Sequence, residues 1–262
     1  MASKFPSSRS ANKANSGSDS EGGFKETFRT VSYAIVFALV VRTFLFEPFN
    51  IPSGSMIPTL LVGDYLFVSK YTYGYSKHSF PFSLSLFSGR IFQSEPERGD
   101  VAVFKLPTDN TTDYIKRIVG LPGDRIQVIS GILHINGKPV IRRRIADFDY
   151  EIGGGRSRKV VRYREVLSGG YTHPIIEMER DSGYLDNTPV YTVPRGHYFM
   201  MGDNRDNSQD SRVLHKVGFV PAENLVGKAQ FLFFSTNGTA RLWEVWKWPF
   251  SIRYGRLFNS IN

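Results

Sequence analysis

A run of apolar residues near the N-terminus is the strongest pattern in the chain. The nineteen residues from Phe28 to Phe46 are nearly all apolar, and Arg42 interrupts them only near the far end. As a helix this run is about 28 Å long, close to the thickness of a bilayer's hydrocarbon core. Arg42 can extend its charge to the interface from that position. The pattern predicts a membrane-spanning helix over residues 24–46.

Two other interpretations of this segment have less support. A buried helix of a soluble domain would show an amphipathic period, which the run lacks. A cleaved export signal would end in small residues, whereas Glu47-Pro48-Phe49-Asn50 follows here. Basic residues precede the run or, in the case of Arg29, lie at its start. They predict a cytoplasmic N-terminus, with the rest of the chain on the outer side of the membrane: Lys4, Arg9, Lys13, Lys25 and Arg29.

After Ile51 the apolar residues come in short or alternating runs, which is typical of β-strands. The runs are separated by turn sequences such as Gly63-Asp64, Pro122-Gly123-Asp124 and Asn136-Gly137. Strands at this spacing predict a sandwich or a partly open barrel. The runs predicted as strands are 65–68, 101–104, 126–129, 132–135 and 198–201.

Composition divides the chain further. Residues 1–23 are rich in serine and poor in large apolar side chains, so we expect a disordered cytoplasmic tail. Residues 138–192 are charged and glycine-rich, and we interpret them as a polar inserted subdomain. The main β domain then comprises residues 47–137 and 193–240, followed by a separate C-terminal segment, 241–262.

Two segments are unusually aromatic. Residues 71–92 carry seven Tyr and Phe side chains, and residues 241–262 hold all three tryptophans with further Phe and Tyr. Ordinary core packing is one interpretation. The other is a belt at the membrane surface, because amphipathic rings and Arg or Lys side chains both favour the headgroup level.

Composition excludes several classes of protein. The 262 residues include 33 Lys+Arg and 24 Asp+Glu, which gives a formal charge of +9. An apolar content of 41% excludes a disordered chain, and the mean hydropathy of −0.24 excludes a polytopic membrane protein. The absence of cysteine excludes disulfides, thiol catalysis and cysteine-ligated metals. The five histidines show no metal-binding spacing, so no metal or cofactor is expected, and the arginine cluster lacks the interleaved aromatic residues of a nucleic-acid site.

Three segments are candidates for chemistry. In Pro52 to Leu60, two serines flank a glycine that lets a ligand backbone approach closely. Lys116 lies in an apolar strand within Tyr114 to Asp124, where desolvation favours the uncharged amine and makes a general base. Gly202 to Arg212 is a dense polar loop suited to holding other groups by hydrogen bonds. Taken alone, the first segment would be interpreted as an ordinary Ser/Gly turn. A lysine inside an apolar run is normally paired with a partner or lies at an edge. The joint presence of the three segments favours chemistry instead.

At these residues the sequence resembles the type I bacterial signal peptidases, membrane-bound Ser/Lys proteases that remove signal peptides from exported proteins. The resemblance rests on four motifs in the family's order: SGSMIPTL (Ser53 to Leu60), RGDVAVF (Arg98 to Phe104), YIKRIVGLPGD (Tyr114 to Asp124) and GDNRDNSQDSR (Gly202 to Arg212). It implies a mostly β chain, with an antiparallel β-sheet catalytic domain that carries an inserted β subdomain and follows one transmembrane helix. Unlike some members, this chain has one clear membrane span and no cysteine pair.

The resemblance also implies roles for individual residues. Ser55 would be the nucleophile, Lys116 its general base, and the Ser53 hydroxyl part of the oxyanion hole. Ser208 would orient the Lys116 amine, and Asp210 and Arg212 would support the loop as an ion pair. Phe49, Ile51 and Ile115 would line shallow pockets for the small residues, usually alanine, that precede the cleaved bond.

The expected partners are exported preproteins with signal peptides and the phospholipid bilayer, and the expected form is a monomer in the bacterial inner membrane. Two alternatives belong to other classes. A self-cleaving Ser/Lys repressor would carry a DNA-binding helix-turn-helix where this chain has its apolar run. A non-catalytic, membrane-tethered β module would not need both Ser55 and Lys116.

Overall fold

The computed structural model describes residues 19–80, 89–153, 156–179, 183–240 and 243–261. The chain divides into two compact units, residues 1–41 and 42–262. The first is dominated by helix α1, Asp19–Phe44, in which Lys25–Phe44 is long and apolar enough to cross a membrane. The expected N-terminal apolar helix is therefore present. It begins at Asp19, five residues before position 24.

Helix α1 ends two residues before the expected boundary at 46, because the chain there turns into a strand. Proline 48 cannot donate a ladder hydrogen bond and disfavours helical geometry at the residue before it. Strand β1, Phe46–Asn50, therefore starts almost directly after the helix and pairs with β2.

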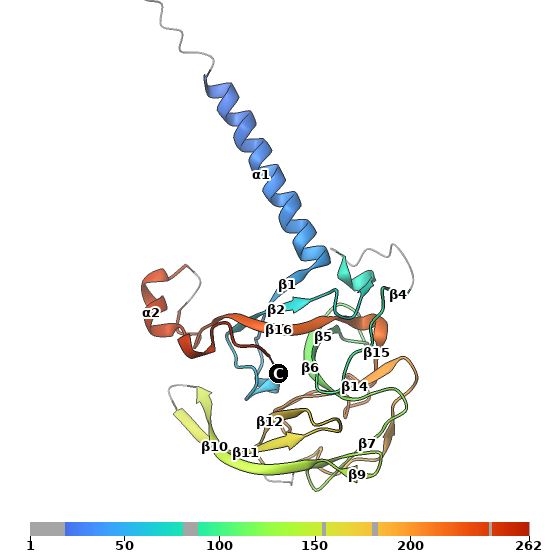
Figure 1. Ribbon diagram of the computed structural model, residues 1–262. Helices are drawn as coiled ribbons and strands as arrows, with labels where there is room; N and C mark the ends of the chain where they lie inside the picture. The colour runs from blue at the N-terminus through green and yellow to red at the C-terminus, as the bar shows by residue number, and fades with distance from the viewer. Residues whose placement is uncertain (1–18, 81–88, 154–155, 180–182, 241–242, 262) are drawn as a thin grey trace, which may run out of the picture. The chain divides into compact units, whose positions relative to one another are not determined.

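The second unit is built mainly from antiparallel strands (Figure 1). A curled seven-stranded sheet has the order β1-β2-β16-β5-β6-β14-β15, and the five strands predicted from the sequence correspond to β2, β5, β7, β8 and β14. The remaining bounds are β2 Asp64–Ser69, β3 Tyr75–Ser76, β4 Arg90–Ile91, β5 Val101–Lys105, β6 Asp113–Gly120, β7 Arg125–Ile129, β8 Ile132–Ile135, β9 Lys138–Pro139, β10 Ile141–Gly153, β11 Arg156–Val166, β12 Thr172–Glu177, β13 Tyr191–Thr192, β14 His197–Met201, β15 Val220–Pro221, β16 Leu225–Ser235 and α2 Trp248–Ser251.

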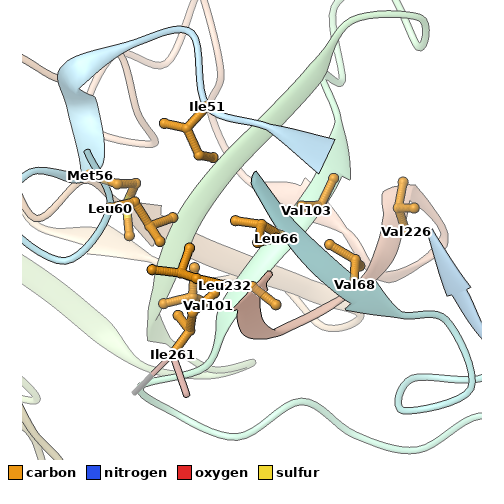
Figure 2. Packing of buried hydrophobic residues seen from close by; sticks show 11 residues of the cluster. Ile51, Met56, Leu60, Leu66, Val68, Val101, Val103, Val226, Leu232 and Ile261 are labelled. Carbon is orange, nitrogen blue, oxygen red and sulfur yellow. The ribbon is translucent and has the colours of Figure 1, made fainter. Parts of the chain in front are cut away.

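One apolar cluster packs inside the curl of this sheet (Figure 2). Side chains from β2, β5 and β16 meet those of Ile51, Met56 and Leu60, which come from the segment after β1. Met56 and Leu60 are completely buried and Ile51 is 3% exposed. Burying a side chain of this size stabilises the fold by about 1.5–3 kcal/mol. The segment between β1 and β2 is therefore held by its apolar residues on both sides of Ser53 and Ser55.

Residues 138–192 do not form one sheet of their own. Strands β10, β11 and β12 make a three-stranded sheet, whereas β9 and β13 complete a four-stranded sheet with β7 and β8. The region is also less uniformly polar than we expected, since Val160, Ile175 and Ile176 are buried. Consecutive residues are buried here, both Val160 and Val161 on β11 and Ile175 to Glu177 on β12, so parts of these two strands are enclosed on both faces.

The aromatic C-terminal segment lies largely at the surface in its described part, 243–261. Trp243 is 67% exposed, Trp246 66% and Phe250 87%. Core packing is therefore wrong for these three rings, and contact with a membrane remains a prediction. Of the other aromatic segment, residues 81–88 lie outside the described residues. In its described part Tyr73 is buried, whereas Tyr71 and Phe92 at the two ends are exposed.

Candidate active site

Ser55 lies in a short 3₁₀ turn, Gly54–Met56, directly after the buried Ile51. The turn is closed by hydrogen bonds from Ile57 N to Gly54 O, 3.2 Å, and from Leu60 N to Met56 O, 2.9 Å. Met56 points into the core, so Ser55 is fixed at the edge of the sheet and is only 8% exposed. Ser53 is exposed, and its hydroxyl oxygen lies 3.5 Å from that of Ser55.

Lys116 comes from the middle of β6, where Ala102 of β5 is its partner on one side. On the other side, the ladder with β14 ends at the Met201–Arg117 pair, so Lys116 has no β14 residue as its ladder partner. Its Nζ lies 2.7 Å from Ser55 Oγ and 3.0 Å from the carbonyl oxygen of Ile115. The two side chains that were singled out from distant motifs are thus in direct contact.

The environment of Lys116 favours the uncharged amine. Its side chain is almost fully buried, and burial lowers the pKa of Lys116 from 10.5 to about 8, although Asp210 and Asp203 raise it in part. No carboxylate among the described residues forms an ion pair with Nζ. A lysine with this pKa is partly neutral near neutral pH and can accept a proton.

A large cleft of about 600 Å³ opens beside this pair. One wall is the chain from Phe49 to Ser55 and the other is the start of β6, residues 113–116. The large cleft includes Phe49, Ile51 and Ile115, the three residues expected to form substrate pockets, together with Val103, Asn207 and Gln209. Ser55 and Lys116 both line this cleft, so a peptide bound in it would lie next to the pair.

The polar loop 202–212 holds the backbone around Ser55. Asn204 N–H donates to the carbonyl oxygen of Ser55 at 3.1 Å, and the Asn204 side-chain amide donates to that of Gly54, also at 3.1 Å. Gly202 approaches so closely that an added Cβ would lie 2.5 Å from the Ser55 carbonyl oxygen and would also meet the Ser208 side chain. Only glycine fits at this contact.

Asp210 and Arg212 form the expected ion pair, with both partners buried. Arg212 donates to the two Asp210 oxygens at 2.9 and 2.8 Å, and Gly202 N–H donates to Asp210 at 3.0 Å. Burial alone would raise the pKa of Asp210, but the Arg212 charge and the hydrogen bonds to the carboxylate together lower that pKa. Ser208 is buried beside Gly202, and no hydrogen bond joins it to Lys116 among the described residues.

A second buried ionic cluster lies directly next to this site. Arg117 donates to the two Asp203 oxygens at 2.9 and 2.8 Å, and the Nδ1 of His173 lies 3.3 Å from Asp203. The other ring nitrogen of His173 lies 3.2 Å from Glu165, which also pairs with Arg205. The cluster therefore joins the sheet formed by β10–β12 to strand β6, which carries Lys116, and to the loop that holds Ser55.

Comparison with known proteins identifies the family of this chain. The family profile described as "Signal peptidase, peptidase S26" matches residues 24–234. The chain belongs to this signal peptidase family. It is 42% identical to the signal peptidase I of Rickettsia typhi over 254 residues, 90% of this chain and 94% of the relative, and 42% identical to that of Rickettsia canadensis, over 90% and 93%.

A solved signal peptidase I from Enterococcus faecalis is 26% identical and covers 52% of this chain and 97% of its own, with a TM-score of 0.30. The assignment therefore rests on the sequence matches. As a signal peptidase, the protein is a serine peptidase that removes signal peptides, and its apolar helix is consistent with a membrane anchor.

Several residues of this signal peptidase site were not found from the sequence. Gly202 and Asn204 stood in a loop that was recognised as a scaffold, but nothing in the pattern assigned their particular contacts. Arg117 carried a signal, because a second charge in an apolar strand needs a buried partner. Glu165 and His173 lie in the inserted region, and no local pattern indicated that they reach the site.

Proposed function

We propose that this protein cleaves signal peptides with Ser55 as nucleophile and Lys116 as general base. The observation that carries the proposal is the 2.7 Å contact between Lys116 Nζ and Ser55 Oγ, made in a buried position where the pKa of the lysine is lowered to about 8. The neutral amine has a lone pair, and it can take the proton from the Ser55 hydroxyl as the oxygen attacks the carbonyl carbon of the peptide bond.

The remaining steps follow from the same groups. Protonated Lys116 gives its proton to the leaving amine nitrogen, the peptide C–N bond breaks, and the signal peptide stays on Ser55 as an ester. Lys116 then takes a proton from water, whose oxygen attacks the ester carbon. The bond from this carbon to Ser55 Oγ breaks, Oγ takes the proton back from Lys116, and the signal peptide leaves with a new C-terminal carboxyl group. The Ser53 hydroxyl and the Ser55 N–H are the candidate oxyanion donors, each worth about 3 kcal/mol in other hydrolases.

The large cleft supports cleavage after small residues. Its floor and walls near Ser55 include Ile51 and Ile115, whose branched side chains leave little room for a bulky residue. A pocket of this kind discriminates one methylene by only about 1–3 kcal/mol. Selectivity for alanine at the first and third positions before the cleaved bond is therefore graded, and Ile115→Ala should widen the choice of cleavage site.

The apolar helix and its basic flank support an orientation with the N-terminus in the cytoplasm and the peptidase unit outside it. Protease added to intact spheroplasts should then digest the unit 42–262. Full protection of that unit would show that it lies on the cytoplasmic side instead.

Cleavage of a labelled preprotein by the full-length protein in detergent tests the chemistry. Ser55→Ala and Lys116→Met should each slow product formation by about 100-fold or more. Ser168→Ala and Lys159→Met, at exposed positions, should cleave at the wild-type rate. Substantial cleavage by either of the first two variants would rule out the Ser55–Lys116 mechanism.

A further inference from the structure

The structure contains a small cleft beside residues 51–62, the segment that carries Ser55 and is called the serine segment here. It has a volume of about 210 Å³ and is lined by Gly54, Ile57, Leu61, Val62, residues 148–151 and Arg253. Gly54 belongs to both the small cleft and the large cleft. The two clefts therefore meet at the residue directly before the proposed nucleophile.

The wall of the small cleft comes from the β10–β11 hairpin of the inserted region. Phe148 and Tyr150 alternate on one face of β10 and pack against Ile57 and Leu61 of the serine segment. This contact explains why a long hairpin in residues 138–192 reaches the site. It also gives the hairpin a surface beside Ser55 that the proposed chemistry does not use.

Tyr150 lies at the junction of the two clefts. Its hydroxyl oxygen would be 3.5 Å from a Cβ at Gly54, and it accepts a hydrogen bond of 3.4 Å from the side chain of Asn207, which lines the large cleft. A peptide chain that passes from one cleft to the other across Gly54 must therefore pass the Tyr150 side chain.

Strand β10 is at the edge of its sheet, because the order is β10-β11-β12. Its outer backbone groups are available to an extended chain, which can add to a sheet edge by main-chain hydrogen bonds. An extended peptide advances about 3.4 Å per residue, so two or three residues beyond the cleaved bond suffice to enter a cleft that borders Gly54.

From these observations we propose that the small cleft binds the first residues of the mature protein, those that follow the cleaved bond, and that Tyr150 determines which side chains are accepted there. This inference rests on the proposed function, because it takes the signal-peptide residues to occupy the large cleft. The signal peptide would then be selected on one side of Ser55 and the mature chain on the other, by residues of the inserted hairpin.

Kinetics on paired substrates test the role of Tyr150. Two preprotein peptides identical up to the cleaved bond, with alanine or tryptophan as the next residue, should differ in kcat/KM for the wild type. Tyr150→Ala should reduce that difference by about threefold to tenfold, the discrimination expected from one partly exposed pocket wall. The ratio for alanine against valine before the cleaved bond should stay unchanged. Ile152→Ala, an exposed apolar residue of the same strand outside the small cleft, is the matched control.

Crosslinking distinguishes a failure of this inference from a failure of the proposed function. A benzophenone side chain at the second position after the cleaved bond, in a peptide bound to Ser55→Ala, should label residues 148–151. The same group at the third position before the bond should label residues 49–51 or 113–115. Labelling of 148–151 together with the kinetic change supports the proposal. If the first probe labels another region or Tyr150→Ala leaves the paired ratio unchanged, the proposal is overturned. If the second probe also misses its segments, the assignment of the large cleft fails as well.

Discussion

Lys116 and Arg117 are neighbours on the same strand, but their pKa values are shifted in opposite directions. Lys116 is 3% exposed and Arg117 is fully buried, so both charges are removed from water to a similar extent. Arg117 has the Asp203 carboxylate in contact, and although burial alone would lower the pKa of Arg117, that partner raises it. Lys116 contacts a serine and a carbonyl, and burial lowers its pKa to about 8.

The comparison shows that burial of a basic side chain is not enough to make it a general base. Alternation along β6 sends the two side chains to opposite sides of the strand, and the loop 202–212 supplies carboxylates to both sides at different distances. Asp203 is in contact with Arg117, whereas Asp203 and Asp210 act on Lys116 only through space. A lysine kept out of contact with any carboxylate can lose its proton, while a paired arginine beside it stabilises the scaffold.

Removing the charge at position 116 should produce the largest effect. Lys116→Met should lower kcat/KM by about 100-fold to 10,000-fold, the range for loss of a general base. Its free energy of unfolding should rise, because a pKa of about 8 instead of 10.5 costs the folded state roughly 3 kcal/mol while the lysine is protonated. Cleavage kinetics and urea unfolding at pH 7 measure the two changes.

The sign of the stability change depends on pH. The cost of burying Lys116 is fully present below the folded pKa of about 8, and it fades as the pH rises to the unfolded value of 10.5. The advantage of Lys116→Met should therefore shrink between pH 8 and 10.5. Lys116→Arg should be both inactive and less stable, because a guanidinium stays charged. An equally active arginine variant would contradict the comparison.

Breaking the Arg117–Asp203 pair should have the opposite effect on stability, because it should lower the free energy of unfolding. Asp203→Asn leaves the Arg117 charge buried without a carboxylate, and removal of one partner from such a pair costs about 3–5 kcal/mol. Urea unfolding should detect this loss directly. Asp147→Asn is the control, because the Arg144–Asp147 pair is exposed to solvent and should contribute little. Equal effects of the two variants would mean that burial of Arg117 does not matter.

The sequence predicted the helices, strands and site residues whose burial or role is visible in a short stretch of neighbouring residues. Alternating apolar residues predicted β2, β5, β7, β8 and β14, and the apolar run predicted α1. Ser55 and Lys116 were recognisable because each lies inside a short motif. The structure brings these two motifs together, although 61 residues separate them in the chain.

The parts that could not be predicted depend on contacts between distant segments. His173 is one polar residue among many in a charged region, yet it lies between Glu165 and Asp203 in the buried cluster. Tyr150 likewise belongs to a hairpin that was interpreted as solvated, and its position beside Gly54 depends on how two sheets pack. Periodicity gives the face on which a residue lies but not the surface that this face meets.

A smaller effect is expected where the loop 202–212 touches the serine segment. In Gly202→Ala the new methyl group would lie 2.5 Å from the Ser55 carbonyl oxygen, which is backbone and cannot move without displacing the nucleophile. We expect a loss of about 1–3 kcal/mol in stability, typical of overpacking, and a fall in kcat with little change in KM. Gly255→Ala, at a position with open space, should leave both unchanged. A fully active Gly202→Ala would show that Ser55 tolerates this displacement.

The smallest effect, a shift of the pH–rate profile, should come from adding a carboxylate near Lys116. The wild-type kcat/KM should rise with pH as Lys116 loses its proton, with a midpoint at about 8. Gln209 is exposed and lines the large cleft together with Lys116, so Gln209→Glu adds a negative charge at the rim without disturbing the core. A negative charge favours the protonated amine, and water screens it, so the midpoint should move upward by about half a pH unit or less. The shift should decrease further in 0.5 M salt, since the Debye length is then only about 4 Å. A pH–rate profile for both enzymes at two salt concentrations measures it. A midpoint near the usual pKa of histidine, or a downward shift in the glutamate variant, would show that Lys116 is not the group whose proton controls the rate.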